Sequence, residues 1–509
     1  MAGVDESRSR MWHDSIYSHL PIALQELAVS LRGAQLHQLR YRSSWSREAS
    51  QSLERQERLS PDALADLQFA ELRRLAGHCY KRSRFYRRLW QAHGVQPQDI
   101  RSFDDVRHIP IVGKQELRAH TEEFFTEKIH GGMTAVHTSG TTGSPLTVYF
   151  SAPDVARRFA FLERCRRWAG VRIGQRRATF TGRHIIPHGQ SAPPFWRHNI
   201  PGRQLLFSSY HLLPANLAAY LDALEDFQPE ILDGYPSAIH VVADYMLRRG
   251  SARRIHPRAI LVSAETVFPH QRQTIEQAFA AKLYNQYASS DGAPFISECR
   301  YGRLHVHTDS GVVEILDGEH NPVSPGRAGE MVVSSFTTSV VPLLRFAMGD
   351  IAVASQEHGP CLCGLPFPTV EALVGRVDDM LYTPDRGFVG RLDTVFKGVP
   401  NSIVEAQIVQ TSPQSIVLRL VPDRCRYQPE HAARIVSQMR DRLGEMVEIS
   451  VEEVASLPRS ANGKMRPVVN ACKDLLPAAF HYATSPADPP ATMAPARRSG
   501  VAGPGLAKL

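Results

Sequence analysis

Between residues 155 and 287 the sequence alternates short apolar runs with segments of helical periodicity. The runs at 259–263 and 283–287 predict strands, and the segment 269–281 between them predicts a helix. Similar patterns predict helices at 155–169 and at 217–227, and strands at 178–182 and 230–233. A further helix is predicted to start from the loop 234–237 and to run through Met246. Strands that alternate with helices favour a mainly parallel sheet covered by helices, so the expected fold class is α/β.

After about residue 300 the pattern changes to short strands and turns. Strand-like segments at 311–316, 329–334 and 350–354 predict a β-rich part of the same large domain, with a distorted barrel as one arrangement. From residue 375 to 478 we expect a small α+β domain. Its predicted strands and helix lie at 415–421, 447–452 and 429–443.

The chain has 509 residues, for which two or three domains are expected. Residues 1–60 predict a helical extension, and the large domain spans 61–374, with its β-rich part at about 300–374. Residues 479–509 are rich in proline, alanine and glycine. They are predicted to be a disordered tail, because they cannot bury enough apolar surface to offset the entropy of ordering.

Composition excludes several classes of protein. The net charge is +8, but the basic residues are spread out, so solvated helix faces are favoured and no nucleic-acid binding is expected. No run approaches ~18 apolar residues, so no membrane insertion is expected. The N-terminus lacks the pattern of a secretory signal. Seven cysteines make no disulfide framework in a chain of this length, which favours a cytoplasmic location.

The segment 138–145, Thr-Ser-Gly-Thr-Thr-Gly-Ser-Pro, holds five small hydroxyl residues and two glycines. Glycine allows a close backbone approach, and hydroxyl groups add donors to the main-chain N–H groups, so a phosphate chain is a natural ligand. No Gly-Lys-Ser/Thr follows, which argues against a P-loop kinase or GTPase. An ordinary polar hairpin turn is the alternative interpretation.

Four further segments carry polar residues after predicted strands or at the domain junction. Asp291 follows the strand 283–287, and Asp350 follows a glycine; a helix N-cap and a turn, respectively, are their alternatives. Asp378 lies in Gly-Arg-Val-Asp-Asp at the junction, where a solvated turn is the alternative. Lys464 ends Pro-Arg-Ser-Ala-Asn-Gly-Lys and could equally be an exposed turn lysine.

With these motifs in this order, the chain resembles the adenylate-forming (acyl-AMP synthetase) superfamily over roughly residues 60–475. More closely it resembles the phenylacetate–CoA ligase branch and its CapK-type relatives. The segments 263–266, 269–272, 396–398 and 405–410 also look CapK-like. The resemblance implies a ligase that activates a carboxylic acid with ATP as acyl-AMP and releases pyrophosphate. A non-catalytic or regulatory nucleotide-binding homologue is the alternative.

The resemblance also implies how ATP is bound. Six residues of the glycine-rich loop would cradle the triphosphate: Thr138, Ser139, Gly140, Thr141, Thr142 and Gly143. Ala264 and Glu265 would lie beside the adenine. Asp350 would accept hydrogen bonds from both ribose hydroxyls, which suits a carboxylate with two oxygens. Arg376 would reach the ribose or the phosphates.

Three residues would take part in catalysis or in domain motion. Asp291 stands where the family usually has Glu, the residue associated with Mg²⁺. Its shorter side chain would shift the ion or bind it through water. Asp378 would be the hinge of a mobile small domain. Lys464 would swing in as a movable point charge at the α-phosphate, with Arg376 as a further catalytic group.

Three cysteines and one histidine have the spacing of a metal site: Cys299, His305, Cys361 and Cys363. Cys₃His is a usual set for closed, structural Zn²⁺, and some relatives of phenylacetate–CoA ligase carry a comparable set. His307 competes with His305, because alternate residues of a strand share a face. His358 is a weaker candidate, and free buried thiols with a surface histidine are the alternative.

The acyl acceptor and the acid are less defined. The segment 381–390 lacks the glycine pattern of CoA-forming relatives, so CoA, an amine, a hydroxyl or a carrier-protein thiol remains open. Oligomeric state is open too, with a homodimer as one option. Basic residues in the pocket region would suit a second negative charge on the acid, and aromatic residues a flat or apolar acid. The candidate pocket residues are Arg183, His184, His188, Phe195, Trp196, Tyr235 and Tyr287.

Overall fold

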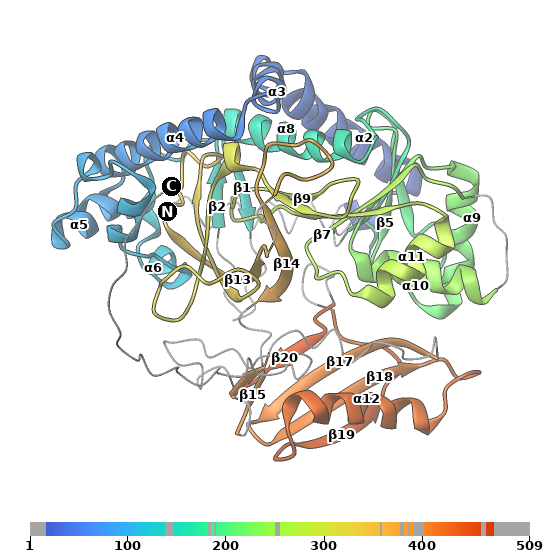
Figure 1. The fold of residues 1–509 in the computed structure, drawn as a ribbon. Helices are drawn as coiled ribbons and strands as arrows, with labels where there is room; N and C mark the ends of the chain where they lie inside the picture. Colours follow the sequence, from blue (N-terminus) through green and yellow to red (C-terminus); the bar gives the residue numbers. More distant parts are fainter. Residues whose placement is uncertain are drawn as a thin grey trace, which may run out of the picture.

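One mixed sheet of twelve strands crosses the large domain in the described part of the chain (Figure 1). The computed structural model describes residues 17–137, 147–181, 183, 185–187, 190–249, 255–356, 359–376, 381–384, 387–389, 402–459 and 465–472. The sheet order is β11-β12-β13-β14-β10-β9-β8-β7-β6-β3-β5-β4. Five neighbouring strands are parallel: β3 (Arg177–Thr181), β5 (Gln204–Ser208), β6 (Ile231–Gly234), β7 (Ala259–Ser263) and β8 (Leu283–Tyr287).

The β-rich part continues this same sheet and does not close into a barrel of its own. The connection is the antiparallel pairing of β8 with β9, in which Gln286 faces Ser297 and Tyr287 faces Ile296. The other strands then add on in antiparallel fashion. They are β9 (Ile296–Glu298), β10 (Leu304–Val306), β11 (Gly311–Leu316), β12 (Ala328–Ser335), β13 (Phe346–Ala354) and β14 (Thr369–Arg376).

Helices cover both faces of the parallel strands because successive side chains point to opposite faces. Ala178, Phe180 and Leu232 join the core beneath α9 (Leu217–Phe227), α10 (Pro236–Arg248) and α11 (Pro269–Phe279). On the other face, Ile231 and Leu261 pack against the residues that follow α8 (Ala152–Trp168). A capping box of Ser151 and Asp154 begins α8.

The N-terminal helices contact both edge strands of the sheet. Ser30 on α2 (Ile22–His37) donates to the carbonyl oxygen of His198 on the edge strand β4 (Trp196–Asn199) over 3.2 Å. Glu26 accepts from the N–H of His198 at 3.1 Å. At the opposite edge, Gln68 on α4 (Pro61–Arg82) donates to the carbonyl of Gly311 at 2.8 Å. Unpaired strand edges invite pairing with other chains, and these side chains occupy backbone groups of His198 and Gly311 on the two edge strands.

Between α2 and α4 the chain forms a π-helix, η1 (Gln38–Arg42), and then α3 (Ser44–Gln56). The other described helices of the large domain are α5 (Arg84–Ala92), α6 (Lys114–Ala119), α7 (Thr121–Phe124) and the 3₁₀ turns η2 (Pro97–Asp99), η3 (Phe103–His108), η4 (Pro214–Asn216) and η5 (Thr308–Ser310). No helix in the described ranges has the length and apolar character needed to cross a membrane.

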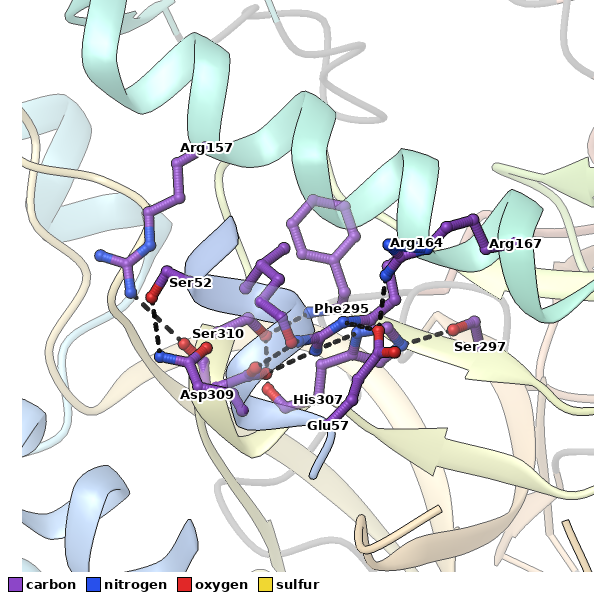
Figure 2. Close-up of polar contacts among 12 residues, drawn as sticks. Ser52, Glu57, Arg157, Arg164, Arg167, Phe295, Ser297, His307, Asp309 and Ser310 are labelled. Carbon is purple, nitrogen blue, oxygen red and sulfur yellow. Dashed lines mark hydrogen bonds and ion pairs between the residues drawn. The ribbon is translucent and has the colours of Figure 1, made fainter. Parts of the chain in front are cut away.

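A buried ionic cluster joins α3, α8 and the sheet (Figure 2). The guanidinium of Arg164 on α8 pairs with Asp309 at 2.6 Å, and both side chains are fully buried. It also forms an ion pair with Glu57, with Nε 2.8 Å from Oε1, and donates a hydrogen bond to the carbonyl of Leu53 at 3.0 Å. Because a buried charge is costly unless paired and hydrogen-bonded, this cluster holds the segment after α3 firmly on α8.

The small domain has a four-stranded sheet in the order β19-β18-β17-β20. Ile435 and Met439 of α12 (Pro429–Leu443) pack with Leu418 and Leu420 of the sheet. The strands of this sheet are β17 (Ile403–Ser412), β18 (Ser415–Pro422), β19 (Glu448–Glu453) and β20 (Val468–Asn470). A separate two-stranded sheet is formed by β15 (Leu381–Thr383) and β16 (Gly387–Val389). It lies below the carboxyl ends of the parallel strands in Figure 1.

Candidate active site

The carboxyl ends of the parallel strands carry several of the predicted site residues, as expected for ligand sites in α/β sheets. Ala264 directly follows β7 and has the unusual φ of +72°. Thr266 donates to the carbonyl of Val374 at the end of β14, at 3.5 Å. Gly375 has φ +122°, and a Cβ there would lie 3.1 Å from the Thr266 hydroxyl. The loop after β7 therefore touches the end of β14.

Asp350 lies beside this junction, on β13. The hydroxyl of Tyr287, the last residue of β8, donates to Asp350 Oδ2 at 2.6 Å. Asp350 is half-buried and faces Arg376 in the β13–β14 register. The side chain of Arg376 lies outside the described residues. A half-buried carboxylate with one oxygen engaged keeps acceptor capacity for a ligand.

Asp291 is 5% exposed and pairs with Lys114, whose Nζ lies 3.2 Å from Oδ2. No helix starts at Asp291 among the described residues; β9 follows it, so the N-cap interpretation is wrong. Arg158 supports this turn by donating to the carbonyl of Ser289 at 2.7 Å. Sequence reasoning missed Lys114, because a lysine at the start of a short helix has no distinguishing local pattern.

The glycine-rich loop lies between two paired strands, β1 (Thr134–His137) and β2 (Thr147–Phe150), with His137 opposite Thr147. The predicted triphosphate residues 138–143 lie outside the described residues. The strand that follows them ends close to Asp291, since a Cβ on Gly292 would lie 3.4 Å from the ring of Phe150. The described arms of the hairpin thus reach the same part of the molecule as Asp291.

Glu265 joins the two domains. Its Oε1 accepts from the main-chain N–H of Met465 at 3.0 Å, and its Oε2 from that of Ser237 at 3.1 Å. Burial raises the pKa of Glu265, and hydrogen bonds from Ser237 oppose that rise. Lys464, the residue before Met465, lies outside the described residues, as does Asp378.

Two arginines reinforce this contact between the domains. Arg459 donates to the hydroxyl of Ser237 at 3.4 Å and also pairs with Glu405 on β17. Further along, Arg248 at the end of α10 lies 2.6 Å from Asp423 of the small domain. A second hydrogen bond and an ion pair between the domains therefore accompany the Glu265 hydrogen bond.

The four predicted zinc ligands come together. Their ligand atoms all lie within 4.8 Å of one another. The thiols of Cys299 and Cys361 are 3.8 Å apart, and Cys363 Sγ lies 3.3 Å from His305 Nε2. The other ring nitrogen of His305 faces the carbonyl of Phe367 at 2.8 Å. A proton on that nitrogen leaves Nε2 free as a ligand, the usual second-shell arrangement of metal-binding histidines.

His307 does not belong to this group. Strand β10 ends at Val306, and the ring of His307 faces Ser297 and lies 3.4 Å from Arg164 (Figure 2). Both rings contact Trp168, but among the described residues it is His305 whose ring reaches the three cysteines. His358 lies outside the described residues.

The candidate acid-pocket residues fall into different surroundings. Phe195 is fully buried and stacks on His211 and Tyr220, so it is a core residue. Tyr235 and Trp196 are half-buried, and Arg183 is exposed just after β3. His184 and His188 lie outside the described residues.

The small α+β domain contacts the large α/β domain at the carboxyl ends of the parallel strands. Together the two domains define the fold of the adenylate-forming ligases. A crystal structure of 2-hydroxyisobutyryl-CoA ligase, in the postadenylation state in complex with R3-HIB-AMP, shares this fold with a TM-score of 0.66. The two chains are 20% identical, and the match covers 83% of this chain and 92% of that one.

The particular family follows from sequence. A family model described as the CapK C-terminal domain matches residues 381–471. Protein CapK of Staphylococcus aureus is 31% identical over 460 residues, covering 90% of this chain and 99% of that protein. A phenylacetate-coenzyme A ligase of Thermus thermophilus is 25% identical over 446 residues, covering 81% and 98%. The chain belongs to the CapK-type, phenylacetate–CoA ligase-like branch of the adenylate-forming superfamily, which confirms the resemblance.

Proposed function

We propose that this protein activates a carboxylic acid with ATP, forming an acyl-adenylate and pyrophosphate, and then transfers the acyl group to an acceptor. The observation that carries the proposal is the Glu265–Met465 contact. It brings Met465, the residue after Lys464, to the carboxyl ends of the parallel strands, near which Asp350 and Asp291 lie. Attack of a carboxylate on the α-phosphate needs the repulsion between two anions to be neutralised and the pyrophosphate to be held in line.

In this proposal each group has one task. Residues 138–143 cradle the triphosphate, and Asp350 accepts hydrogen bonds from the ribose hydroxyls. Ala264 and Glu265 border the adenine. Lys464 and Arg376 stabilise charge at the phosphates, and the small domain turns about Asp378 between adenylation and acyl transfer.

Asp291 would hold Mg²⁺ when the nucleotide binds. The ion would neutralise charge on the phosphates. The carboxylate is buried and keeps one oxygen beyond the contact with Lys114, so its donor set fits a hard cation. Lys114 already lies 3.2 Å from it and supplies positive charge at this place.

Cys299, His305, Cys361 and Cys363 would hold a structural Zn²⁺. The donor set fits, since three thiols and one imidazole nitrogen converge in a partly buried cluster. Burial also lowers the pKa of His305, which favours the neutral, metal-binding ring. The site would clip the turn after β9 to the segment before β14. A cytoplasmic location, predicted from the cysteines, stays a prediction.

Adenylation is tested by acid-dependent release of pyrophosphate from ATP, with a broad acid panel and detection of acyl-adenylates by mass spectrometry. The Lys464→Ala variant should lose at least about 100-fold in rate yet keep most of its ATP affinity, whereas Lys128→Ala, an exposed control, should not. Unchanged behaviour of Lys464→Ala, with ATP still bound, would instead favour the regulatory homologue. Adding CoA, amines or a carrier protein to the preformed adenylate identifies the acceptor.

A further inference from the structure

Lys114 begins α6 from a fixed point of the main chain. Two residues before it, Val112 forms an isolated parallel bridge with the start of β13. The N–H of Val112 donates to the carbonyl of Arg345 at 3.1 Å, and its carbonyl accepts from the N–H of Ala347 at 2.8 Å. The lysine is therefore anchored beside β13, the strand that carries Asp350 (Figure 1).

The turn that carries Asp291 is fixed on both sides of this residue. The N–H of Asp291 donates to the hydroxyl of Ser289 at 3.0 Å, and the hydroxyl of Ser335 donates to the carbonyl of Gly292 at 2.6 Å. Arg158 on α8 donates to the carbonyl of Ser289 at 2.7 Å. The Asp291 carboxylate therefore projects from a backbone whose position is set before any ligand binds.

The two side chains meet where little water reaches them. Lys114 Nζ lies 3.2 Å from Asp291 Oδ2, and the side chains are only 19% and 7% exposed. Within the described ranges this is the only ion pair that either side chain makes. A buried charge that loses its partner is strongly destabilising. Each group therefore needs a replacement before the pair can separate.

The pair lies beside the proposed ribose contact. Asp291 follows β8, whose last residue, Tyr287, donates to Asp350 at 2.6 Å. Lys114 follows the bridge to β13, the strand of Asp350. The chain on either side of the ion pair thus leads to the carboxylate that would hold the ribose. Groups that bind phosphates are expected at this distance along the nucleotide.

The proposed role of Asp291 as a metal ligand conflicts with its present partner. A divalent cation on this carboxylate would stand close to the Lys114 ammonium, and repulsion between like charges is strong where water is scarce. The nucleotide supplies both replacements at once. Its metal ion takes the carboxylate, and its phosphates carry more negative charge than that ion neutralises.

We propose that Lys114 exchanges partners when ATP binds: its ammonium leaves Asp291 and binds the β- and γ-phosphates, which depart as pyrophosphate. This rests on the proposed acid activation. There, a carboxylate oxygen bonds to the α-phosphorus, the bond from that phosphorus to the bridging oxygen breaks, and pyrophosphate leaves with the electron pair. Lys114 stabilises this leaving charge from the large domain. Lysine suits the task, because its ammonium is a compact charge on a flexible stem.

The experiment measures binding to the full chain and needs no turnover. Mn²⁺ alone, followed by electron paramagnetic resonance, should bind Lys114→Met at least about fivefold more tightly than the unmodified protein, because Asp291 has lost its resident cation. This gain should vanish when Asp291→Asn is added. Radiolabelled pyrophosphate with Mg²⁺, followed by equilibrium dialysis, should bind Lys114→Met at least about tenfold more weakly. AMP, which lacks the β- and γ-phosphates, should bind both proteins equally.

Two matched variants serve as controls. Lys114→Arg keeps the charge and should retain part of the pyrophosphate affinity. Gln115→Ala, at the exposed neighbouring position on α6, should change neither binding constant. If the methionine variant does not fold, Lys114→Gln replaces it in both measurements.

Equal pyrophosphate affinity in Lys114→Met and the unmodified protein would overturn the inference. So would Mn²⁺ binding that is no tighter in the variant, because Lys114 would then not compete for Asp291. An equal loss of AMP and pyrophosphate affinity would also overturn it, since the lysine would then only maintain the shape of the site. If no acid releases pyrophosphate, the proposed function fails, while both binding measurements still decide the inference.

Discussion

The main-chain N–H of Met465 donates a hydrogen bond of 3.0 Å to Oε1 of Glu265, across 200 residues of sequence. Glu265 follows β7 of the large domain, and Met465 precedes β20 of the small one. Since Glu265 also accepts from Ser237 at the start of α10, this one carboxylate holds the small domain to two elements of the large domain.

Replacing Glu265 by alanine should slow adenylation about 10- to 100-fold, because charge-assisted hydrogen bonds contribute ~1.5–3 kcal/mol. Glu265→Gln keeps an acceptor oxygen and should lose less. Acid-dependent pyrophosphate release measures both. An alanine variant with an unchanged adenylation rate would show that this contact does not set the position of the small domain.

The pH profile should also report Glu265, whose pKa is raised by burial above its ordinary value of 4.5. The carboxylate that accepts from Met465 exists above the raised pKa, so adenylation should fall as pH drops through it. Stability should change in the opposite direction. The folded state holds the proton more tightly, so ionisation lowers stability as pH rises through the folded-state pKa. Rates and thermal midpoints measured against pH check both limbs, and both should disappear in Glu265→Gln, whose amide does not titrate.

Asp423→Ala should weaken the second contact between the domains by removing the partner of Arg248. Both side chains are mostly buried, and Arg248 keeps Asp244. The expected cost is therefore moderate, about 1 kcal/mol or up to tenfold in adenylation rate. Small-angle scattering should show a larger radius of gyration. Arg424→Ala, at the exposed neighbouring position, is the control, and an equal effect in that variant would contradict the assignment.

Asp350→Ala should remove discrimination at the ribose. The kcat/KM of the unmodified enzyme should be at least about tenfold higher with ATP than with 2′-deoxy-ATP. With the deoxy nucleotide, the Asp350 carboxylate loses a hydroxyl donor, and an acceptor left without its donor costs free energy. The variant should use both poorly and equally. Tyr287→Phe, which removes the 2.6 Å hydrogen bond to Asp350, should lower the ratio partly. If Asp350→Ala keeps the full preference for ATP, the carboxylate does not contact the ribose.

Cys363→Ser should lower bound zinc from about one ion per chain, as measured by plasma mass spectrometry of the purified protein. Loss of a structural site should reduce the thermal midpoint by at least about 5 °C. Trp168 lies edge-on to His305 with ring centres 6.0 Å apart, so its fluorescence should change with metal removal. The exposed Cys425→Ser should behave as wild type. Full zinc content in Cys363→Ser would rule the site out.

Local patterns predicted the elements better than the contacts between them. The strands at 259–263 and 283–287 and the helix at 429–443 have the predicted bounds, because apolar periodicity depends on neighbouring residues alone. That the β-rich segment extends the parallel sheet depends on the pairing of Tyr287 with Ile296. No local pattern encodes such a pairing.

The candidate site shows the same division. Cys299, His305, Cys361 and Cys363 could be grouped from spacing and chemistry, and the structure brings them together. The choice of His305 over His307 needed the ring contacts, because His305 faces Cys363 whereas His307 faces Ser297 and Arg164. Lys114 carries no motif, and its contact emerges only when a distant segment of the chain meets Asp291. The triphosphate loop, Asp378 and Lys464 remain predictions.

The side chains of α2 along β4 have a consequence for the purified protein. Glu26 and Ser30 occupy the outward N–H and C=O of His198, so no foreign strand can dock there without first displacing a helix. A version lacking residues 1–37 would expose that backbone as a template for chain-to-chain pairing. Truncation of the amino terminus for crystallisation should therefore give protein that aggregates or forms fibrils, and not a better-ordered enzyme.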